Sequence, residues 1–362
     1  MFSMHDNQEI LEGLRENIRR WGRQLGFDAI GFAAASISDA EENLRAWLAA
    51  GCHGEMDYMA AHLTDAAAGA RYKRALPAEL VPGTRSVITA RMNYRPAAAD
   101  SSAALADANR AFISRYALGR DYHKLLRGRL QKLADRITGE IGNFSFRVFA
   151  DSAPVMEVGL ARNSGLGWRG KHTLLLDRDA GSYFFLGELL TDLPLAADVP
   201  VTDHCGSCTA CLDACPSAAI IAPYRLDARL CVSYLTIELK GSIPAALRPL
   251  MGNRIYGCDD CQMACPWNRF APLTREKDFA PRHKLDQARL VALFAWEEAD
   301  FHQRLAGSPI RRIGFERWLR NIAVALGNAP RSDEVINALR SRADHPSPMV
   351  REHVAWALRR LR

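Results

Sequence analysis

The chain has 362 residues, enough for two or three domains, and its 48% hydrophobic and 24% charged residues are typical of a globular protein with a substantial core. No apolar run approaches the roughly 18 residues of a membrane-spanning helix, and no apolar segment follows Arg19 and Arg20, as an export signal would require. We therefore expect a cytoplasmic protein with no membrane association, and its net charge of +6 favours an anionic partner over a cationic one.

The chain up to about Leu193 predicts an α/β or α+β domain. Apolar residues at helical spacing predict helices over residues 7–25, 41–50 and 121–138. Short apolar or alternating runs predict strands over residues 29–33, 86–90, 144–150 and 182–190, of which the last has the sequence of a central strand. Residues 97–109 are rich in Ala, Ser and Asp, and we expect a loop there.

Two stretches of this domain carry candidate chemistry. Residues 165–170 match the dinucleotide-binding pattern G-x-G-x-x-G, but residues 154–163 before them predict a helix instead of the required strand, so we reject this interpretation. Asp151 lies between a predicted strand and this helix. Its carboxyl can serve as a proton donor at the end of the strand, or Asp151 or Ser152 can be the N-cap of the helix.

Eight of the nine cysteines fall within residues 205–265. The first run has the spacing C-x2-C-x2-C-x3-C-P, in which three thiolates bind one [4Fe-4S] cluster and the fourth binds another. The second run lacks its leading cysteine, because Ile255 occupies that position, and Cys231 is the nearby thiol that can replace it. The crossed pattern assigns Cys205, Cys208, Cys211 and Cys265 to one cluster, and Cys215, Cys231, Cys258 and Cys261 to the other.

Structural zinc and disulfides are the alternatives for these cysteines. Two Cys-Pro endings are untypical of zinc sites, which usually pair two C-x-x-C hairpins. Disulfides require an oxidising compartment, which we do not expect here. Cys52 fits no motif, and we treat it as an ordinary thiol.

The chain after Pro266 is helical in pattern throughout. The segment 322–326 recurs as 354–358, 32 residues later, and a helix is predicted between them over residues 333–341. Repeated small-residue faces of this kind indicate a short HEAT-type repeat. Two units are fewer than usually stand alone, so we expect them to pack on the rest of the protein.

The same end of the chain is basic. Residues 311–362 contain eleven Arg, no Lys and five acidic residues, so they carry the whole net charge of +6. This pattern favours a nucleic acid as the partner, whereas the alternative is a solvated helix face.

Four stretches resemble the epoxyqueuosine reductase family, which comprises cobalamin-dependent tRNA-modifying enzymes related to reductive dehalogenases. They are residues 115–124, 151–157, 165–173 and 182–192, and the cysteine segment with residues 231–238 completes the match. Together with the helical end, the resemblance covers nearly the whole chain. It implies a nitroreductase-like cobalamin-binding domain over residues 1–196, a bacterial-type two-cluster ferredoxin domain over 197–275, and an all-α HEAT-like tRNA-binding domain over 276–362.

The resemblance also implies the reaction, which is the two-electron deoxygenation of the epoxide of epoxyqueuosine at the tRNA wobble position to give queuosine. Reduced cobalamin would be fed by the two clusters from an external one-electron donor, and Asp151 stands at the general-acid position of the family. Residues expected to border the cobalamin are Arg74, Ser114, Asp151, Lys171, His172, Ser233 and Asp259. Residues expected to contact tRNA are Arg311, Arg312, Arg320 and Arg351, in a chain that we expect to be a monomer.

Two other functions remain open on the sequence. One is a cobalamin-dependent reductive dehalogenase of a small molecule, against which the basic helical end argues. The other is a non-catalytic ferredoxin-like electron-transfer protein, which would leave Asp151 and the glycine-rich stretch 165–170 without a role. A measurement of cobalt content distinguishes the electron-transfer protein, which should contain no cobalt, from the cobalamin-dependent enzymes.

Overall fold

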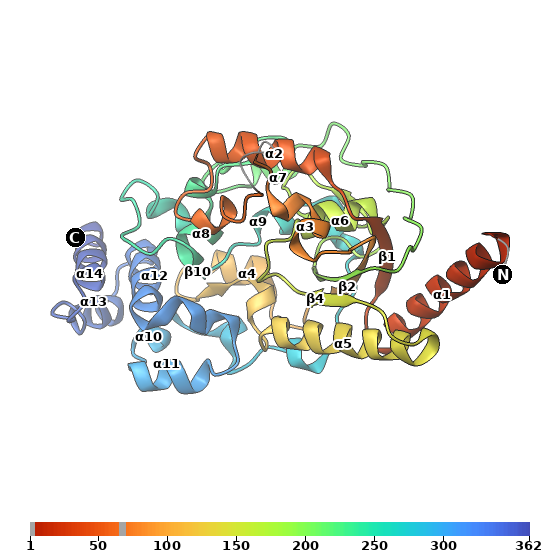
Figure 1. The fold of residues 1–362 in the computed structure, drawn as a ribbon. Coiled ribbons are helices and arrows are strands. Elements are labelled where there is room, and N and C mark those ends of the chain that lie inside the picture. Colours follow the sequence, from red (N-terminus) through yellow and green to blue (C-terminus); the bar gives the residue numbers. More distant parts are fainter. Residues whose placement is uncertain (1–3, 65–69) are drawn as a thin grey trace. The chain divides into compact units, whose positions relative to one another are not determined.

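The computed structural model describes residues 4–64 and 70–362, and the chain divides into two compact units that are each assembled from separate stretches of sequence (Figure 1). The first unit comprises Met1–Tyr94, Tyr122–Thr209 and Cys265–Pro272. The second unit comprises Arg95–Asp121, Ala210–Ala264 and Leu273–Arg362. Within the described residues, no helix combines the length and the apolar character needed to cross a membrane.

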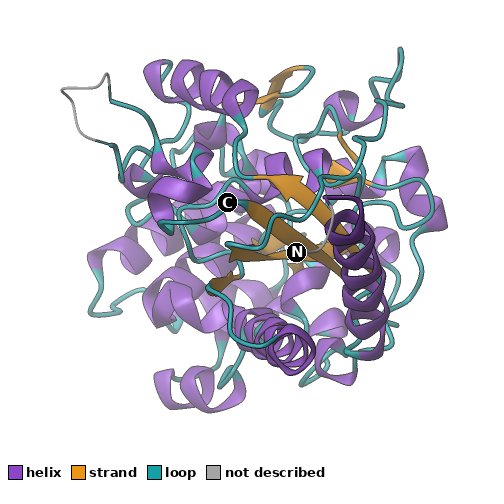
Figure 2. Cartoon of the chain, turned by 45° about the vertical axis from the view of Figure 1, so that its right-hand side comes forward, coloured by secondary structure: helices purple, strands orange, loops and turns teal. Residues whose placement is uncertain are grey.

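A four-stranded antiparallel sheet forms the centre of the first unit, with strand order β1-β2-β7-β4 (Figure 2). The strands are β1 (Ala29–Ala34), β2 (Ser86–Asn93), β7 (Phe184–Thr191) and β4 (Phe146–Phe149). All four coincide with predicted strands, and β7 lies inside the sheet, as its sequence indicated. Every residue of β2 is buried, which requires that both faces of the sheet are covered.

Helices cover the two faces of this sheet. The helices of the unit are α1 (Met4–Gln24), α2 (Ser38–Ala49), α3 (Pro77–Leu80), α5 (Tyr122–Ile141) and α6 (Glu157–Asn163). Helix α5 lies on one face and α6 on the other (Figure 1). A Cβ atom on Gly187 of β7 would lie 3.0 Å from Leu130 of α5, so Gly187 faces that helix. Because successive residues of a strand point to opposite faces, the next residue, Glu188, faces α6.

The glycine-rich stretch 165–170 belongs to a loop and a hairpin. Helix α6 precedes it, and β5 (Trp168–Arg169) pairs with β6 (Leu175–Leu176) directly after it. At Gly167, φ is +148°, and a Cβ atom would lie 2.0 Å from the carbonyl oxygen of Leu176, so this close approach requires glycine. The predicted helix before this stretch is confirmed, where a dinucleotide-binding motif requires a strand.

The second unit contains most of the cysteine segment. Its short elements are α4 (Ser101–Ala106), β3 (Phe112–Ile113), α7 (Ala210–Asp213), β8 (Ile220–Ala222), β9 (Arg225–Leu226), α8 (Val232–Ile237), β10 (Arg254–Tyr256) and α9 (Asp260–Met263). The prediction of a loop over residues 97–109 is wrong in part, because α4 occupies its middle. The side chain of Asp100 accepts a hydrogen bond from the amide of Ala103 at 2.7 Å and so caps this helix.

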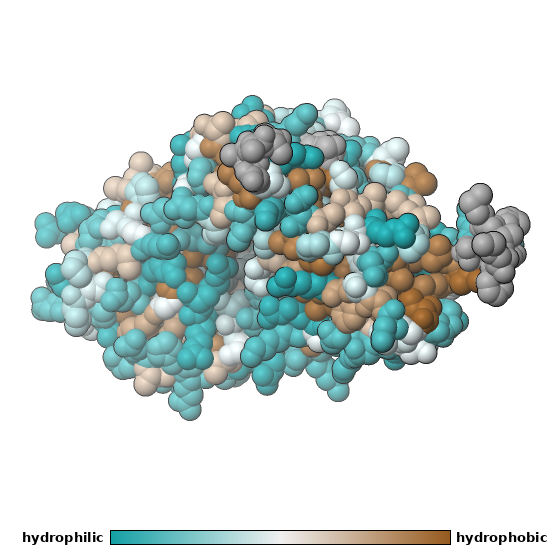
Figure 3. Space-filling view, in the orientation of Figure 1, coloured by the Kyte–Doolittle hydropathy of each residue, from teal (hydrophilic) through white to brown (hydrophobic). Residues whose placement is uncertain are grey.

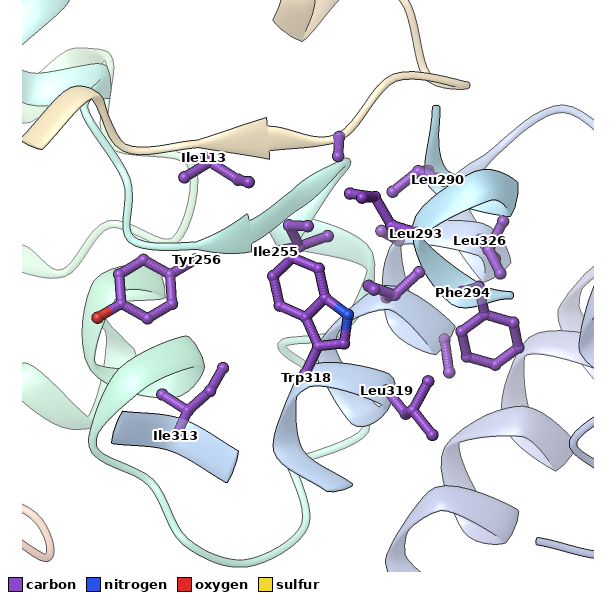
Figure 4. Packing of buried hydrophobic residues seen from close by; sticks show 14 of the residues in the cluster. Ile113, Ile255, Tyr256, Leu290, Leu293, Phe294, Ile313, Trp318, Leu319 and Leu326 are labelled. Carbon is purple, nitrogen blue, oxygen red and sulfur yellow. The ribbon is translucent and has the colours of Figure 1, made fainter. Parts of the chain in front are cut away.

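The rest of the second unit is helical, as predicted after Pro266. Its α-helices are α10 (Leu290–Phe294), α11 (Glu298–Arg304), α12 (Gly314–Asn328), α13 (Asp333–Arg340) and α14 (Pro348–Arg360). They enclose the largest hydrophobic core, in which Trp318 and Leu319 of α12 lie beside Leu293 and Phe294 of α10 (Figure 4). The two repeated segments lie on α12 and α14, which pack against each other. The HEAT-type classification stays a prediction.

Candidate functional site

The Asp151 side chain lies at the end of β4, where the sequence placed a candidate proton donor. Its Oδ2 atom accepts a hydrogen bond from the Tyr122 hydroxyl at 2.6 Å and lies 2.9 Å from His123 Nε2. Both partners belong to the first turn of α5, and the Tyr122 ring stacks on Phe185 at 3.8 Å between centroids. The Asp151 side chain is 47% exposed, so a substrate can reach a carboxyl whose orientation is already fixed.

The alternative in which Asp151 or Ser152 caps the helix is wrong. Helix α6 begins at Glu157, three residues later than the sequence predicted, and its N-cap is Met156, whose side chain makes no capping hydrogen bond. The amide of Asp151 instead donates a hydrogen bond to Glu157 Oε1 at 2.5 Å. Glu157, the first residue of the helix, therefore holds the backbone of Asp151, and Asp151 does not cap the helix.

Glu157 and Glu188, two glutamates near Asp151, lie in the stretches 151–157 and 182–192 that resemble the family, and neither was predicted to have a role. Glu188 is fully buried in the middle of the sheet, and Glu157 is partly buried at the start of α6. Burial, followed by the charge of nearby Asp151, raises the pKa of Glu157 to about 7. Burial, followed by the neighbouring Glu157 carboxyl, raises the pKa of Glu188 well above its usual value. A glutamate inside an apolar strand run was the signal that could have identified this pair.

The cysteines of the predicted clusters are all free thiols in the structure. Burial, followed by the nearby Cys231, raises the pKa of the Cys261 thiol, and Cys215 and Cys211 add to this effect. Burial also raises the pKa of Cys265, with Cys205 and Cys208 as the neighbouring thiols. Thiols gathered in this way ionise readily only when a cation compensates their charge, which the iron of a cluster does.

The residues predicted to border cobalamin in the first unit differ in what they contact. Lys171 is buried, and its Nζ donates to the carbonyls of Gly206 at 2.6 Å and Cys208 at 2.9 Å. Two of the three N–H groups of its ammonium thus hold the loop of the first cysteines, and the cobalamin contact at Lys171 stays a prediction. His172 and Arg74 are also buried, and each has one side-chain nitrogen, His172 Nε2 and Arg74 Nε, without a hydrogen-bond partner among the described residues.

Two predicted cofactor-bordering residues of the second unit are joined to each other. The Ser114 hydroxyl donates to Asp259 Oδ1, and the amide of Arg115 donates to Asp259 Oδ2 at 2.8 Å. Asp259 is almost fully buried, and burial raises the pKa of its carboxyl. Ser233, at the start of α8, is partly buried. The structure thus pairs Ser114 with Asp259, although they lie far apart in the sequence.

The arginines predicted to contact tRNA separate into two groups. Arg311, Arg312 and Arg351 are exposed. Hydrophilic residues cover much of the face of the chain that Figure 3 shows. Arg320 is fully buried, and its guanidinium donates to the carbonyls of Leu235, Leu239 and Gly241, so it cannot bind a phosphate. The prediction of a tRNA contact at Arg320 is wrong, because helix α12 has no solvated face at this position.

Two family models match the chain. The model described as "Epoxyqueuosine reductase QueG, DUF1730" matches residues 74–152. The model described as "4Fe-4S double cluster binding domain" matches residues 204–268, which confirms the two-cluster interpretation of the cysteine spacing.

Curated relatives match over almost the full length of the chain. The epoxyqueuosine reductase of Pseudomonas aeruginosa is 58% identical over 96% of this chain and 94% of its own length, and that of Escherichia coli is 54% identical over 96% and 89%. A solved epoxyqueuosine reductase with a tRNA stem loop modified with epoxyqueuosine is 28% identical, with a TM-score of 0.86 over 97% of this chain and 91% of that one. One from Bacillus subtilis, with its catalytic loop swung out of the active site, has a TM-score of 0.83 at 28% identity over 97% and 91%. The chain belongs to the epoxyqueuosine reductase family.

Proposed function

We propose that the chain reduces epoxyqueuosine in the anticodon loop of tRNA to queuosine. The observation that carries this proposal is the identity of 54–58% to epoxyqueuosine reductases over almost the whole chain. The reaction breaks both C–O bonds of an epoxide, consumes two electrons and two protons, and yields an alkene and water. The site must therefore bind RNA, receive electrons singly and supply protons to the departing oxygen.

We assign the first proton to the carboxyl of Asp151. The side chain is exposed enough to reach a substrate, and Tyr122 and His123 hold one of its oxygens in place. A positioned acid of this kind contributes roughly 10²–10⁴-fold to a rate. The Tyr122 hydroxyl, by donating to Oδ2, also stabilises the carboxylate that remains after proton transfer.

Two [4Fe-4S] clusters, when bound, accept and release single electrons. For one cluster we propose the ligands Cys205, Cys208, Cys211 and Cys265, and for the other Cys215, Cys231, Cys258 and Cys261. Eight free thiols with the spacing of a double-cluster domain fit this donor set. Cys208 is exposed, whereas Cys211 and Cys265 are buried, so an external one-electron donor can approach the chain at Cys208.

Cobalamin, when bound, supplies a cobalt centre reducing enough to break a C–O bond, which no side chain provides. The orphaned nitrogens of Arg74 and His172 fit such a group, because a buried donor without a partner costs free energy that an acceptor on a ligand removes. Burial lowers the pKa of His172 to about 4, and its Nδ1 accepts from the amide of Leu174, so Nε2 carries the hydrogen. We propose these two residues, together with Asp151, Ser114, Ser233 and Asp259, as the border of the cofactor.

For the RNA we propose contacts from Arg311, Arg312 and Arg351, which are exposed and suited to phosphate oxygens. The division into a nitroreductase-like domain (1–196), a ferredoxin domain (197–275) and a HEAT-like tRNA-binding domain (276–362) is retained as part of this proposal. We also propose that the chain acts as a monomer, and that it acts in the cytoplasm, where tRNA is modified.

The proposal is tested by anaerobic incubation of the reduced protein and cobalamin with tRNA that bears epoxyqueuosine. Mass spectrometry of the digested nucleosides should show loss of one oxygen, and a parallel reaction without cobalamin should not. Unmodified epoxyqueuosine in the complete reaction, with both clusters present and reduced, would reject the proposed function.

A further inference from the structure

The loop that carries Asp151 has a backbone conformation that its own sequence does not favour. Asp151 has φ of +58°, in the left-handed region that is costly for residues other than glycine. The amide of Ser152 donates to the carbonyl of Ala150 at 2.7 Å, so the turn spans only three residues with Asp151 at its centre. A three-residue turn with a positive central φ is the rare, strained form of the γ-turn. Such a turn persists only when surrounding contacts fix it.

One of these contacts comes from Glu157. Its Oε1 accepts the hydrogen bond from the Asp151 amide, and it is the first residue of α6, a helix packed on the sheet. The Glu157 carboxyl is therefore attached to a rigid element, whereas Asp151 is in a loop. This contact holds the backbone, while Tyr122 and His123 hold the side chain.

Glu188 is the second buried carboxyl near Glu157. It is fully buried on the face of the sheet that α6 covers, opposite Thr89 of β2 and Phe149 of β4 in the register, and its two carboxyl oxygens have no hydrogen-bond partner among the described residues. Two neighbouring carboxyls at a buried position cannot both ionise cheaply, so the pKa of each is raised. The other charged groups that act on Glu157 are Asp151 and His123.

We propose that Glu157 is a positioning residue that holds the Asp151 loop in its reactive conformation. The inference rests on the proposed function, in which Asp151 is the proton donor. The Glu157 carboxyl accepts from the Asp151 amide through Oε1. Glutamine keeps this contact, because its side-chain carbonyl also accepts a hydrogen bond.

The first test is hydrogen exchange of the cluster-loaded protein, followed by mass spectrometry of peptides that contain the Asp151 amide. In Glu157→Ala we expect exchange at this amide to rise about tenfold, the effect of losing one hydrogen bond. Glu157→Gln should restore protection to within about threefold of the parent. Glu140→Ala, which changes an exposed glutamate at the end of α5, is the matched control and should leave this amide protected.

The second test is single-turnover deoxygenation with pre-reduced enzyme. We expect the rate in Glu157→Ala to fall about tenfold with little change in tRNA affinity, and Glu157→Gln to recover most of it. The hydrogen bond from the Asp151 amide favours the ionised carboxylate of Glu157, so protection of this amide in the parent, corrected for intrinsic exchange, should rise as the pH rises through about 7. In Glu157→Gln this pH dependence should be absent.

The outcomes separate this inference from the proposed function. Parental protection and turnover in Glu157→Ala would overturn the positioning role. Equal loss of turnover in Glu157→Ala and Glu157→Gln, with a protected amide, would also overturn it, because the proton of Glu157 would then be needed in the chemistry. If Asp151→Asn keeps parental turnover, the acid assignment fails, although the loop can still be held by Glu157. If Glu157→Ala does not fold, the comparison of the parent with Glu157→Gln carries the test, because only the parent should show the pH dependence, and an equal pH dependence in both would overturn the positioning role.

Discussion

Replacement of Arg320 by Met tests whether this arginine is an internal support or an RNA contact. Its buried guanidinium donates to the carbonyls of Leu235, Leu239 and Gly241 at 2.6–2.8 Å, at and just beyond the end of α8. Each buried carbonyl left without a donor costs about 1–3 kcal/mol. The Met variant no longer has to bury a charge, and this gain offsets part of the cost of the three unpaired carbonyls. We therefore expect a net destabilisation of about 2–5 kcal/mol.

The assay is a thermal scan of anaerobically purified protein at a fixed heating rate, together with titration of tRNA. For a unit of this size, roughly 2–4 °C per kcal/mol predicts a fall in Tm of roughly 5–20 °C. Arg311→Met, which removes an exposed arginine, is the matched control and should leave Tm within about 1–2 °C of the parent. A parental Tm in Arg320→Met would refute the support role. Weaker tRNA binding at a parental Tm would restore Arg320 as an RNA contact.

Three further predictions test the acid, the cluster ligands and the basic end. Asp151→Asn keeps the size of the side chain and its hydrogen bond from Tyr122 but not the transferable proton, so single-turnover rates should fall by roughly 10²–10⁴ at parental iron content. Cys231→Ala should lower iron from about eight to about four per chain and remove the spectrum of one cluster only; a full iron count would reject this ligand. Joint replacement of Arg311, Arg312 and Arg351 by Gln should reduce the slope of log affinity against log salt by somewhat under one unit per lost phosphate contact, and an unchanged slope would favour a solvated helix face.

The parts of the fold that local patterns determine could be predicted from the sequence. Strands β1, β2, β4 and β7 were identified because alternation or continuous apolar character follows directly from which faces are buried. The double-cluster segment was identified because metal coordination fixes cysteine spacing. The prediction of a loop over residues 97–109 was wrong in part, because a run of small residues is compatible both with a loop and with the short helix that Asp100 caps.

Residues whose role depends on three-dimensional neighbours could not be assigned in this way. A tRNA contact was predicted at Arg320 because arginine is usually exposed, but residues 318–327 of α12 are all buried. The apolar run 322–327 that follows Arg320 and Asn321 is typical of a helix without a solvated face, and this was the available signal. Glu188 is a similar case, because it lies inside the apolar run of a strand. For both residues, a charged group in or beside an apolar run indicated burial.

The last part of the cysteine segment shows why cofactor motifs and compact units need not have the same boundaries. Cys265–Pro272 begins with the second Cys-Pro pair, at the end of the cysteine segment, but belongs to the first unit. Asn268 fixes it there, because its buried side chain accepts from the amide of Ser182 at 2.6 Å and donates to the Ser182 hydroxyl at 3.0 Å. A Cβ atom on Gly181 would lie 2.1 Å from Asn268 Oδ1, so the neighbouring glycine is required. Asn, Ser and Gly indicate only turns in a sequence. A domain boundary at residue 196 therefore separates the predicted cofactor-binding segments. It does not separate the compact units, because Ser182 packs against Asn268, which lies 86 positions later in the chain.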